Sequence, residues 1–386
     1  MKSGWQIRKL GDICDFDKAQ GVYKNLPYVG LEDIESNTAR FVGSSDPKKV
    51  KSSTFRFSDK HVLYGRLRPY LNKVLAPDFE GHCSTEIFPI KPHSVLSREY
   101  LLYWFLAKET VDSINATCTG TRMPRADMNE VLEFDFPLPT LLEQKRIVGI
   151  LDEAFEGIAV AKANAEKNLH RVSEIAEGLL HAVFDQSWHT WKAQRISEVG
   201  EVFDGPHATP KTVESGPIFL GISSLRRGEI DLGETRHVSE KDFKQWTRRV
   251  APQENDVVFS YETRIGEVAR IPSGLECCLG RRMALVRVNQ SVIDSEFFVL
   301  QYRSPQFQEF LRTKTIHGAT VDRISIREFP SFPIRVPRLV EQRVIIERSK
   351  GLRIQIDELE QNYQQKLTAL DELKKSLLHQ AFTGKL

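Results

Sequence analysis

The stretch LPTLLEQKRIV, residues 138 to 148, decides the fold, because a close copy, VPRLVEQRVII, occurs at residues 336 to 346. The offset of 198 positions holds without a gap between residues 120–184 and residues 318–382. Of these 65 aligned positions 17 are identical, whereas ordinary composition would give roughly 4 by chance. The chain therefore contains an internal duplication, and each copy includes the start of a helix.

The duplication extends upstream in shorter blocks that keep their order. WQIRKLGDI (5–13) parallels WKAQRISEV (191–199), and HVLYGRLRPYLNKV (61–74) parallels DVVFSYETRIGEV (256–268). Short β-type runs separated by Gly, Pro and Asn predict strands, while YLLYWFLAKET (100–110) and EFFVLQYRS (296–304) predict helices. We therefore expect an α+β (mixed α/β) fold with two similar domains, 1–139 and 187–337, each followed by a helical segment, 140–186 and 338–386.

Apolar residues in both helical segments recur at alternating spacings of three and four. A repeat of 3.5 residues sustained over about five heptads is typical of a coiled-coil seam. Both seams belong to one chain, so we expect the two segments to pair with each other as an antiparallel coiled coil, which would also bring Leu386 near Met1. The seam positions are Ile147, Leu151, Ile158, Val172 and Leu179 in the first segment, and Ile345, Leu352, Ile356, Leu359, Leu370, Leu373 and Leu377 in the second.

The starts of the two segments differ in one respect. Thr140 and Glu143 have the spacing of a capping box directly after Pro139. The second copy keeps Glu341 but has Arg338 at the position of the capping hydroxyl. We expect a helix to begin at both places.

Length and composition set further limits. A chain of 386 residues, 40% of them hydrophobic, suits two globular domains of ordinary size. It contains no long apolar run of the kind that spans a membrane, and its first residues lack the apolar core of a secretory signal. The five cysteines form no Cys-x-x-Cys pair, which favours buried, reduced thiols. We expect a cytoplasmic protein.

No motif for catalysis is found. The glycine turn of a methyl-donor site, the aromatic loop that holds a target amine and the phosphate-binding GxxxxGK[ST] are all missing. Glu86 and Lys91 superficially suit a metal-dependent nuclease, but they are five positions apart and the second copy has Arg282 where Glu86 stands. We therefore predict no catalytic residue, no metal site and no cofactor bound by this chain.

Two glycine-containing loops at equivalent positions are candidates for docking on a DNA backbone. TGTRMPR (119–125) and HGATVDR (317–323) each place glycine, a hydroxyl and an arginine before the segment that leads to the long helix. Glycine permits close approach to phosphate, and arginine can donate two hydrogen bonds to phosphate or to guanine. The candidate residues are Gly120, Thr121, Arg122 and Arg125 in the first loop, and Gly318, Thr320 and Arg323 in the second.

Readout of bases is expected where the two copies differ. The net charge of +2 is too small to indicate nucleic acid by itself, so the prediction depends on local clusters. For any single arginine, an ion pair on a solvated surface is an equally good explanation. The candidates are Arg66, Arg68, Tyr70 and Lys73 in the first domain, and Tyr261, Arg264, Arg270, Arg281 and Arg282 in the second.

The order of these features resembles the specificity (S) subunits of type I restriction-modification systems. The resemblance rests on Trp5 and Trp191, the Gly-hydroxyl turns, the Pro-x-x-x-Glu-Gln helix starts and the closing LLHAVF (179–184) and LLHQAFTGKL (377–386). It implies two target-recognition domains, each reading half of a bipartite site in double-stranded DNA, separated by two conserved helices that set the spacing.

The resemblance also implies partners. Two methyltransferase (M) subunits would dock on this chain, and restriction (R) subunits would join them, with no role for a membrane. S-adenosylmethionine, ATP and Mg²⁺ would be used by those partner subunits, while this chain would be non-catalytic.

Two other functions remain open at this stage. The chain could be a stand-alone nuclease or methyltransferase with duplicated recognition domains, which would modify DNA without partners. It could instead be a scaffold whose coiled coil joins two protein-binding modules, in which case it would protect no DNA duplex.

Overall fold

The computed structural model describes residues 4–120, 122–185, 190–318 and 321–386, with some side chains between 173 and 185 left out. The chain divides into two compact units. Unit 1 comprises residues 1–167 and 363–386, and unit 2 comprises residues 168–362. Each unit therefore contains one globular domain together with part of each long helix.

The described part of unit 1 contains two four-stranded sheets and a two-stranded ribbon. The ribbon pairs β1 (Gln6–Lys9) with β10 (Asp135–Leu138). One sheet has the antiparallel order β2 (Cys14–Phe16), β9 (Ile87–Pro92), β6 (Val62–Gly65) and β7 (Val74–Leu75). The other has the order β3 (Gln20–Gly21), β5 (Thr54–Phe57), β8 (Gly81–Cys83) and β4 (Tyr28–Val29), in which β4 and β8 run parallel.

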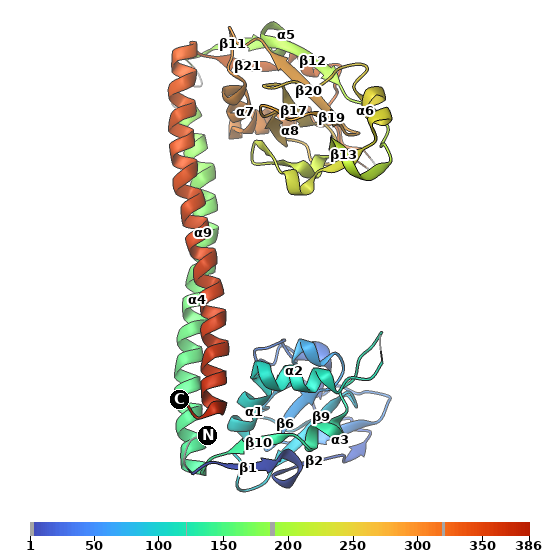
Figure 1. The fold of residues 1–386 in the computed structure, drawn as a ribbon, viewed down its shortest axis with the longest axis vertical. Coiled ribbons are helices and arrows are strands. Elements are labelled where there is room, and N and C mark those ends of the chain that lie inside the picture. The colour runs from blue at the N-terminus through green and yellow to red at the C-terminus, as the bar shows by residue number, and fades with distance from the viewer. Residues whose placement is uncertain (1–3, 121, 186–189, 319–320) are drawn as a thin grey trace. The chain divides into compact units, whose positions relative to one another are not determined.

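Three short helices complete the globular part of unit 1 (Figure 1). They are α1 (Arg98–Leu106), α2 (Lys108–Ala116) and α3 (Met128–Leu132). The sequence predicted one helix over 100–110, but the backbone is extended at Ala107, so a second helix begins at Lys108. The core of this part includes fully buried aromatic residues of β6, α1 and β10, namely Tyr64, Tyr100, Phe105 and Phe136.

Unit 2 repeats this plan. The ribbon pairs β11 (Lys192–Arg195) with β21 (Pro333–Val336), and the main sheet has the order β12 (Gly200–Asp204), β20 (Met283–Val288), β17 (Val257–Ser260) and β18 (Val268–Arg270). The second sheet has the order β16 (Arg236–Val238), β13 (Thr212–Leu220) and β19 (Cys277–Leu279), and unit 2 adds the hairpin of β14 (Leu225–Arg226) and β15 (Glu229–Ile230). Its short helices are α5 (Ile196–Val199), α6 (Glu240–Trp246), α7 (Ser295–Arg303) and α8 (Pro305–Lys314).

The sheet orders confirm the duplication outside the helices. In each unit the strand after the tryptophan pairs with the last strand of the domain, and the next strand joins a sheet through the equivalent partner. The mixed α and β fold class predicted from the sequence is therefore the one observed.

Two helices of 45 residues, α4 (Leu141–Asp185) and α9 (Leu339–Thr383), cross both units. In unit 1, Ile147 and Leu151 from the start of α4 share a core with Leu378 and Ala381 from the end of α9. In unit 2, Phe184 from the end of α4 shares a core with Ile346 from the start of α9. Opposite ends of the two helices meet in each unit, so their directions are antiparallel (Figure 1).

Both ends of the described chain lie in unit 1. Trp5 and Leu386 pack against the same hydrophobic core, and Arg146 Nη2 donates a hydrogen bond to the Leu386 carbonyl at 2.8 Å. Met1 itself, which the sequence placed near Leu386, lies outside the described residues.

In α4, the predicted seam is followed as far as Val172. Ile147, Leu151, Ile158 and Val172 are each less than 8% exposed. The side chain of Leu179 lies outside the described residues.

In α9 two of the seven predicted seam positions do not face inward. Ile345, Leu352, Ile356, Leu370 and Leu377 are half-buried. Leu359 and Leu373, however, are 45% and 47% exposed, which corrects the prediction for both. The inward-facing residue after Ile356 comes four positions later and not three. Glu360 is therefore half-buried where Leu359 was expected, and Lys374 is half-buried where Leu373 was expected.

Glu360 and Lys374, which take the inward positions, contact the globular domains and α4. Glu360 accepts two hydrogen bonds from the guanidinium of Arg227, at 2.8 and 3.1 Å. Lys374 donates to the Asn37 carbonyl at 3.0 Å and its ammonium group lies 5.0 Å from the centre of the Phe155 ring. We expect these polar contacts to help set which face of α9 turns inward, and the apolar periodicity alone does not indicate them.

The repeated Glu-Gln pair fastens each helix to its own domain. Gln144 is fully buried; it accepts from Ser97 N at 2.7 Å and donates to the carbonyls of Val95 and Pro139 at 2.9 Å. Gln342 makes the same three bonds in unit 2, with Asp294 N at 2.8 Å and with the carbonyls of Val292 and Pro337.

The glutamates of the two pairs serve the helix starts. Thr140 Oγ1 accepts from Glu143 N at 3.4 Å, so the predicted cap is present. In the second copy Glu341 accepts from Arg338 N at 3.2 Å, which replaces the missing hydroxyl.

Candidate nucleic-acid interface

In unit 1 the first candidate loop is joined to the end of β6 by backbone hydrogen bonds. Ala126 N donates to the Arg66 carbonyl at 2.9 Å and Arg68 N donates to the Pro124 carbonyl at 2.8 Å. Thr119 and Arg125 exchange two backbone bonds of 3.1 Å, which close the loop. These bonds hold residues 66–68 beside residues 119–126, although the two segments are about 60 positions apart. We call this arrangement, together with Glu86, the recognition frame of unit 1, and it brings together the candidates from both segments.

Glu86 organises the charges of this frame. Its carboxylate accepts from Arg125 Nε at 3.0 and 3.1 Å and from Arg66 Nε at 3.1 Å. Burial alone would raise the pKa of Glu86, but the hydrogen bonds from the two guanidinium groups outweigh it and lower the pKa. Glu86 is therefore the centre of a structural ion cluster and is not positioned as a metal ligand.

The same backbone frame recurs in unit 2. Ile324 N donates to the Tyr261 carbonyl at 2.8 Å and Thr263 N donates to the Asp322 carbonyl at 3.2 Å. Arg323 and Ile316 exchange two backbone bonds, as Arg125 and Thr119 do in unit 1. The frame also includes Tyr261 N bonded to the Arg282 carbonyl, matching the bond from Arg66 N to the Glu86 carbonyl.

Although the frames match, their charges are exchanged. Arg282 stands where Glu86 stands in unit 1, and it pairs with Glu262 at 2.9 Å and donates to Thr263 Oγ1 at 2.8 Å. Tyr261 takes the place of Arg66, and burial together with the nearby Asp204 carboxylate raises the pKa of its hydroxyl, which stays protonated at neutral pH. The two frames consequently offer different polar groups on the same backbone.

Several predicted DNA-binding residues are engaged within the protein. Lys73 Nζ donates to the carbonyls of Leu31 and Ile34 at 2.6 and 2.7 Å, and Arg264 pairs with Glu267. Arg270 pairs with Glu296 at 3.0 Å, away from the frame. DNA contact by these residues stays a prediction, and it would require them to exchange or share their present partners.

Four predicted arginines are exposed and have no side-chain hydrogen bond or ion pair with any residue that the structure describes. They are Arg68 and Arg122 in unit 1, and Arg281 and Arg323 in unit 2. Arg68 has a left-handed backbone with φ 52°, as Arg282 next to Arg281 does with φ 71°. Each unit therefore has, at its frame, two exposed guanidinium groups without a partner among the described residues. These four arginines are the strongest candidates for contact with phosphates or bases.

The remaining candidates have defined places. Tyr70 is 52% exposed and Gly120 has φ +86°, a conformation that favours glycine. Gly318 has no such angle, but a Cβ there would lie 2.5 Å from the Val321 carbonyl oxygen, so its closeness to the backbone requires glycine. Thr121 and Thr320 lie outside the described residues.

Sequence reasoning missed the acidic partners and the role of glutamine. Glu86 and Glu262 hold the arginines of the two frames, and Gln144 and Gln342 join the helices to the domains. The replacement of Glu86 by Arg282 between the copies was visible in the alignment, and a search for a compensating exchange nearby would have found Glu262.

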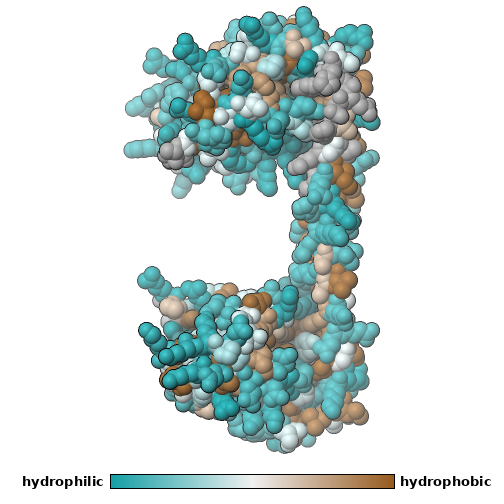
Figure 2. All heavy atoms as spheres, turned by 180° about the vertical axis from the view of Figure 1, so that it is seen from behind, coloured by the Kyte–Doolittle hydropathy of each residue, from teal (hydrophilic) through white to brown (hydrophobic). Residues whose placement is uncertain are grey.

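The faces seen in Figure 2 are mainly hydrophilic, with hydrophobic residues scattered among them. Within the described ranges no three His, Cys, Asp or Glu residues gather to hold a metal ion. No helix among the described residues combines the length and apolar character that a membrane span needs.

Comparison with known proteins agrees with this arrangement of two recognition frames on a duplicated chain. Residues 2–169 and 189–369 match the family described as Type I restriction modification DNA specificity domain, and the chain belongs to this family. It is thus a DNA sequence-recognition subunit of a type I restriction-modification system.

The relatives are distant in sequence. The type I restriction enzyme EcoDI specificity subunit of Escherichia coli is 26% identical over 195 residues, which is 50% of this chain and less than half, 44%, of that protein. The putative type I restriction enzyme MjaX specificity subunit of Methanocaldococcus jannaschii is 23% identical over 420 residues, covering 99% of this chain and 93% of that protein.

Solved structures support the fold. One chain, from work on complex assembly and conformational transition of the type I R-M system, has a TM-score of 0.80 and 21% identity, covering 100% of this chain and 99% of that chain. The HsdS subunit from Thermoanaerobacter tengcongensis has a TM-score of 0.62 and 21% identity, with coverage of 100% and 98%.

Proposed function

We propose that each unit reads one half of a bipartite DNA site, using its own frame of backbone-linked loops. The observation that supports this is the pair of matching frames with exchanged charges, Glu86 against Arg282, each flanked by two exposed arginines. A shared backbone gives both units one docking geometry, while different side chains select different bases.

The test is a map of modified adenines made by complexes that carry single variants. With Arg68 and Arg281 reading bases, Arg68→Ala is expected to relax one half-site and Arg281→Ala the other, since loss of one base contact costs about 1 to 3 kcal/mol at the contacted position. If both variants relax the same half, or leave both halves unchanged, the assignment of one half-site to each unit is wrong.

We further propose that recognition and chemistry belong to different subunits of the assembly. Methyltransferase and restriction subunits would supply the chemistry, with S-adenosylmethionine, ATP and Mg²⁺, while this chain selects the site. Support comes from membership of the specificity family. Methyl transfer to a target duplex is expected only when the methyltransferase partner is added, and transfer by the purified chain alone would favour a stand-alone enzyme.

The long helices would set the spacing between the half-sites. An insertion of seven residues keeps the 3.5-residue repeat, so one heptad is added to α4 after Lys167 and one to α9 after Asn362. Each insertion lengthens its helix by about 10.5 Å, close to three base-pair steps of 3.4 Å. The preferred spacer is expected to grow by about three base pairs; an unchanged spacer would contradict the role of the helices.

A further inference from the structure

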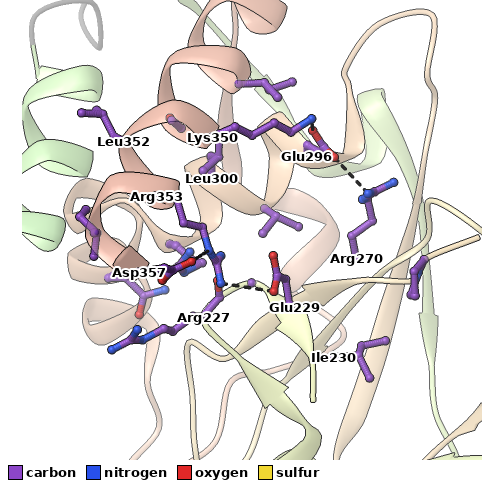
Figure 3. A pocket seen from close by; sticks show the side chains of 18 of the residues that line it. Arg227, Glu229, Ile230, Arg270, Glu296, Leu300, Lys350, Leu352, Arg353 and Asp357 are labelled. Carbon is purple, nitrogen blue, oxygen red and sulfur yellow. Dashed lines mark hydrogen bonds and ion pairs between the residues drawn. The ribbon is translucent and has the colours of Figure 1, made fainter. Parts of the chain in front are cut away.

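Unit 2 contains a pocket of about 840 Å³ that the DNA-reading proposal does not use (Figure 3). It lies between the hairpin β14–β15, the helices α7 and α8, and the first half of α9. Its volume is that of an ordinary small-molecule site. All its lining residues belong to unit 2, so it is a feature of one compact unit.

The rim of the pocket consists of ion pairs. Glu296 bridges Lys350 at 2.6 Å and Arg270 at 3.0 Å, and Glu229 pairs with Arg353 at 3.3 Å. Figure 3 shows Lys350 and Arg353 reaching from α9 to Glu296 and Glu229 of the globular domain. The carboxylates at the rim are therefore already occupied by cations.

Arg303 is the exception among the cations of the pocket. It forms no hydrogen bond or ion pair with any residue that the structure describes, although it ends α7 inside the lining. Its guanidinium lies against Gly228, where an added Cβ would come within 3.3 Å of Arg303 Nη1. Burial, reinforced by the positive charges of Arg353 and Arg227, lowers the pKa of Arg303.

Arg303 is half-buried, and a guanidinium that has lost part of its water without gaining a counter-ion is in an unfavourable environment. Glu229 and Glu267 are near enough to act on its charge, but they pair with Arg353 and Arg264. An anion placed in the pocket would supply the missing partner.

The pocket also has apolar walls. Val299 is 6% exposed, and the hydroxyl oxygen of Ser349 is buried with no hydrogen-bond partner. Apolar lining residues come from α7, α9 and the hairpin, namely Val299, Leu300, Ile346, Leu352, Ile356 and Ile230. A ligand that fits would combine one anionic group with an apolar body.

Unit 1 shows why this space is open in unit 2. By the matched N-termini of α1 and α7, Tyr103 corresponds to Leu300 and Leu106 to Arg303, and the offset of 198 matches Phe155 with Arg353. Tyr103 and Phe155 pack edge to face, with ring centroids 5.4 Å apart, and Leu106 is 9% exposed. Aromatic and aliphatic side chains occupy this place in unit 1, whereas unit 2 has an arginine and a cavity.

We infer that this pocket binds a small organic anion, with Arg303 as the partner of its carboxylate or phosphate group and the apolar walls holding its body. The site is separate from the recognition frame, and the inference does not depend on which bases the frame reads.

The probe is 8-anilino-1-naphthalenesulfonate, an aromatic anion whose fluorescence rises on binding, titrated into the full-length chain. Arg303→Leu introduces the residue found in unit 1 and makes the pocket more apolar, so weaker binding can come only from loss of the cation. We expect at least a tenfold rise in the dissociation constant. Arg327→Leu, the same change at an exposed arginine that does not line the pocket, is the matched control and should change nothing.

A second variant protects the test against misfolding of the first. Leu300→Tyr places the unit 1 side chain in the cavity and should also abolish probe binding, while inorganic phosphate should compete with the probe in the unaltered protein. Equal probe affinity in the unaltered protein and in Arg303→Leu, with both folded by circular dichroism, would overturn the inference. Displacement of the probe by a target duplex through Arg303 would also overturn it, because the pocket would then belong to the DNA interface.

Discussion

Unit 1 and unit 2 have the same backbone plan but differ in where they place charge. In unit 1 a central glutamate, Glu86, holds two arginines, whereas in unit 2 a central arginine, Arg282, is held by Glu262. An ion pair at the centre of the frame is kept, although its residues and its net charge have changed. The four exposed arginines, Arg68, Arg122, Arg281 and Arg323, have no side-chain partner among the described residues, so their replacement removes no ion pair of the frames.

In contrast, the hydrogen bonds that attach the long helices to the globular domains are the same in both units. Gln144 and Gln342 are both fully buried and make the same three backbone hydrogen bonds in their units. A buried amide satisfies two carbonyls and one N–H, and few other side chains can do so. The duplication has therefore kept the parts that attach helix to domain and varied those that meet solvent.

The largest expected effect breaks this shared attachment in one unit only. Gln144→Leu leaves the Ser97 N–H and two carbonyls without partners, which should destabilise unit 1 by about 3 kcal/mol. Hydrogen exchange of residues 95–106 should accelerate strongly, while residues 292–303 keep their protection.

Gln342→Leu is the reciprocal control and should exchange the two outcomes. Uniform acceleration in both units from either variant would show that the attachments are not independent.

The second effect sharpens the contrast between paired and unpaired arginines. The double variant Arg68→Ala with Arg122→Ala should weaken binding to duplex DNA by about 10- to 100-fold, and it should reduce the slope of log affinity against log salt by about 2. Arg281→Ala with Arg323→Ala should do the same in unit 2. Fluorescence anisotropy over a salt series measures both quantities.

Arg146→Ala is the matched control for charge, because Arg146 is already neutralised by Glu143 at 2.7 Å. It should leave the salt slope unchanged. An equal loss in this control would mean that the double variants act through net charge and not through contact.

Much of the architecture could be predicted from the sequence, because it depends on repetition and periodicity. The offset of 198 identified both helices, and the spacing in α4 located Ile147, Leu151 and Ile158 in buried positions. The sequence could not show which arginines are already paired, since Arg66 finds Glu86 twenty positions away through the register of β6 and β9. The pocket beside Arg303 was equally hidden, because it results from a local exchange in which Leu300 and Arg353 replace the packed rings of Tyr103 and Phe155.

The third effect concerns the Glu86 carboxylate, which unit 2 replaces by Arg282, and it is measured as the dependence of stability on pH. The pKa of Glu86 is lowered from its ordinary value of 4.5, so the stability it contributes is present above that value and is lost as the pH falls through the lowered pKa. Glu86→Gln should cost about 1 to 2 kcal/mol at pH 7, and the difference from the unaltered protein should close at strongly acid pH. Urea unfolding followed between pH 7 and pH 3 measures this, and a gap that stays constant would argue against the ion cluster.

The smallest effect distinguishes the two helices of the coiled coil. Leu373 and Leu359 are nearly half exposed although the apolar repeat places them in the seam, whereas Leu151 in α4 is fully buried. Leu373→Gln should change the free energy of unfolding by less than about 0.5 kcal/mol, as ordinary surface substitutions do. Leu151→Ala should cost about 2 to 5 kcal/mol, because it opens a cavity in a packed core. If Leu373→Gln proved as costly as Leu151→Ala in thermal unfolding, α9 would turn the face given by its apolar repeat inward, and the anchors at Glu360 and Lys374 would not be what fixes its rotation.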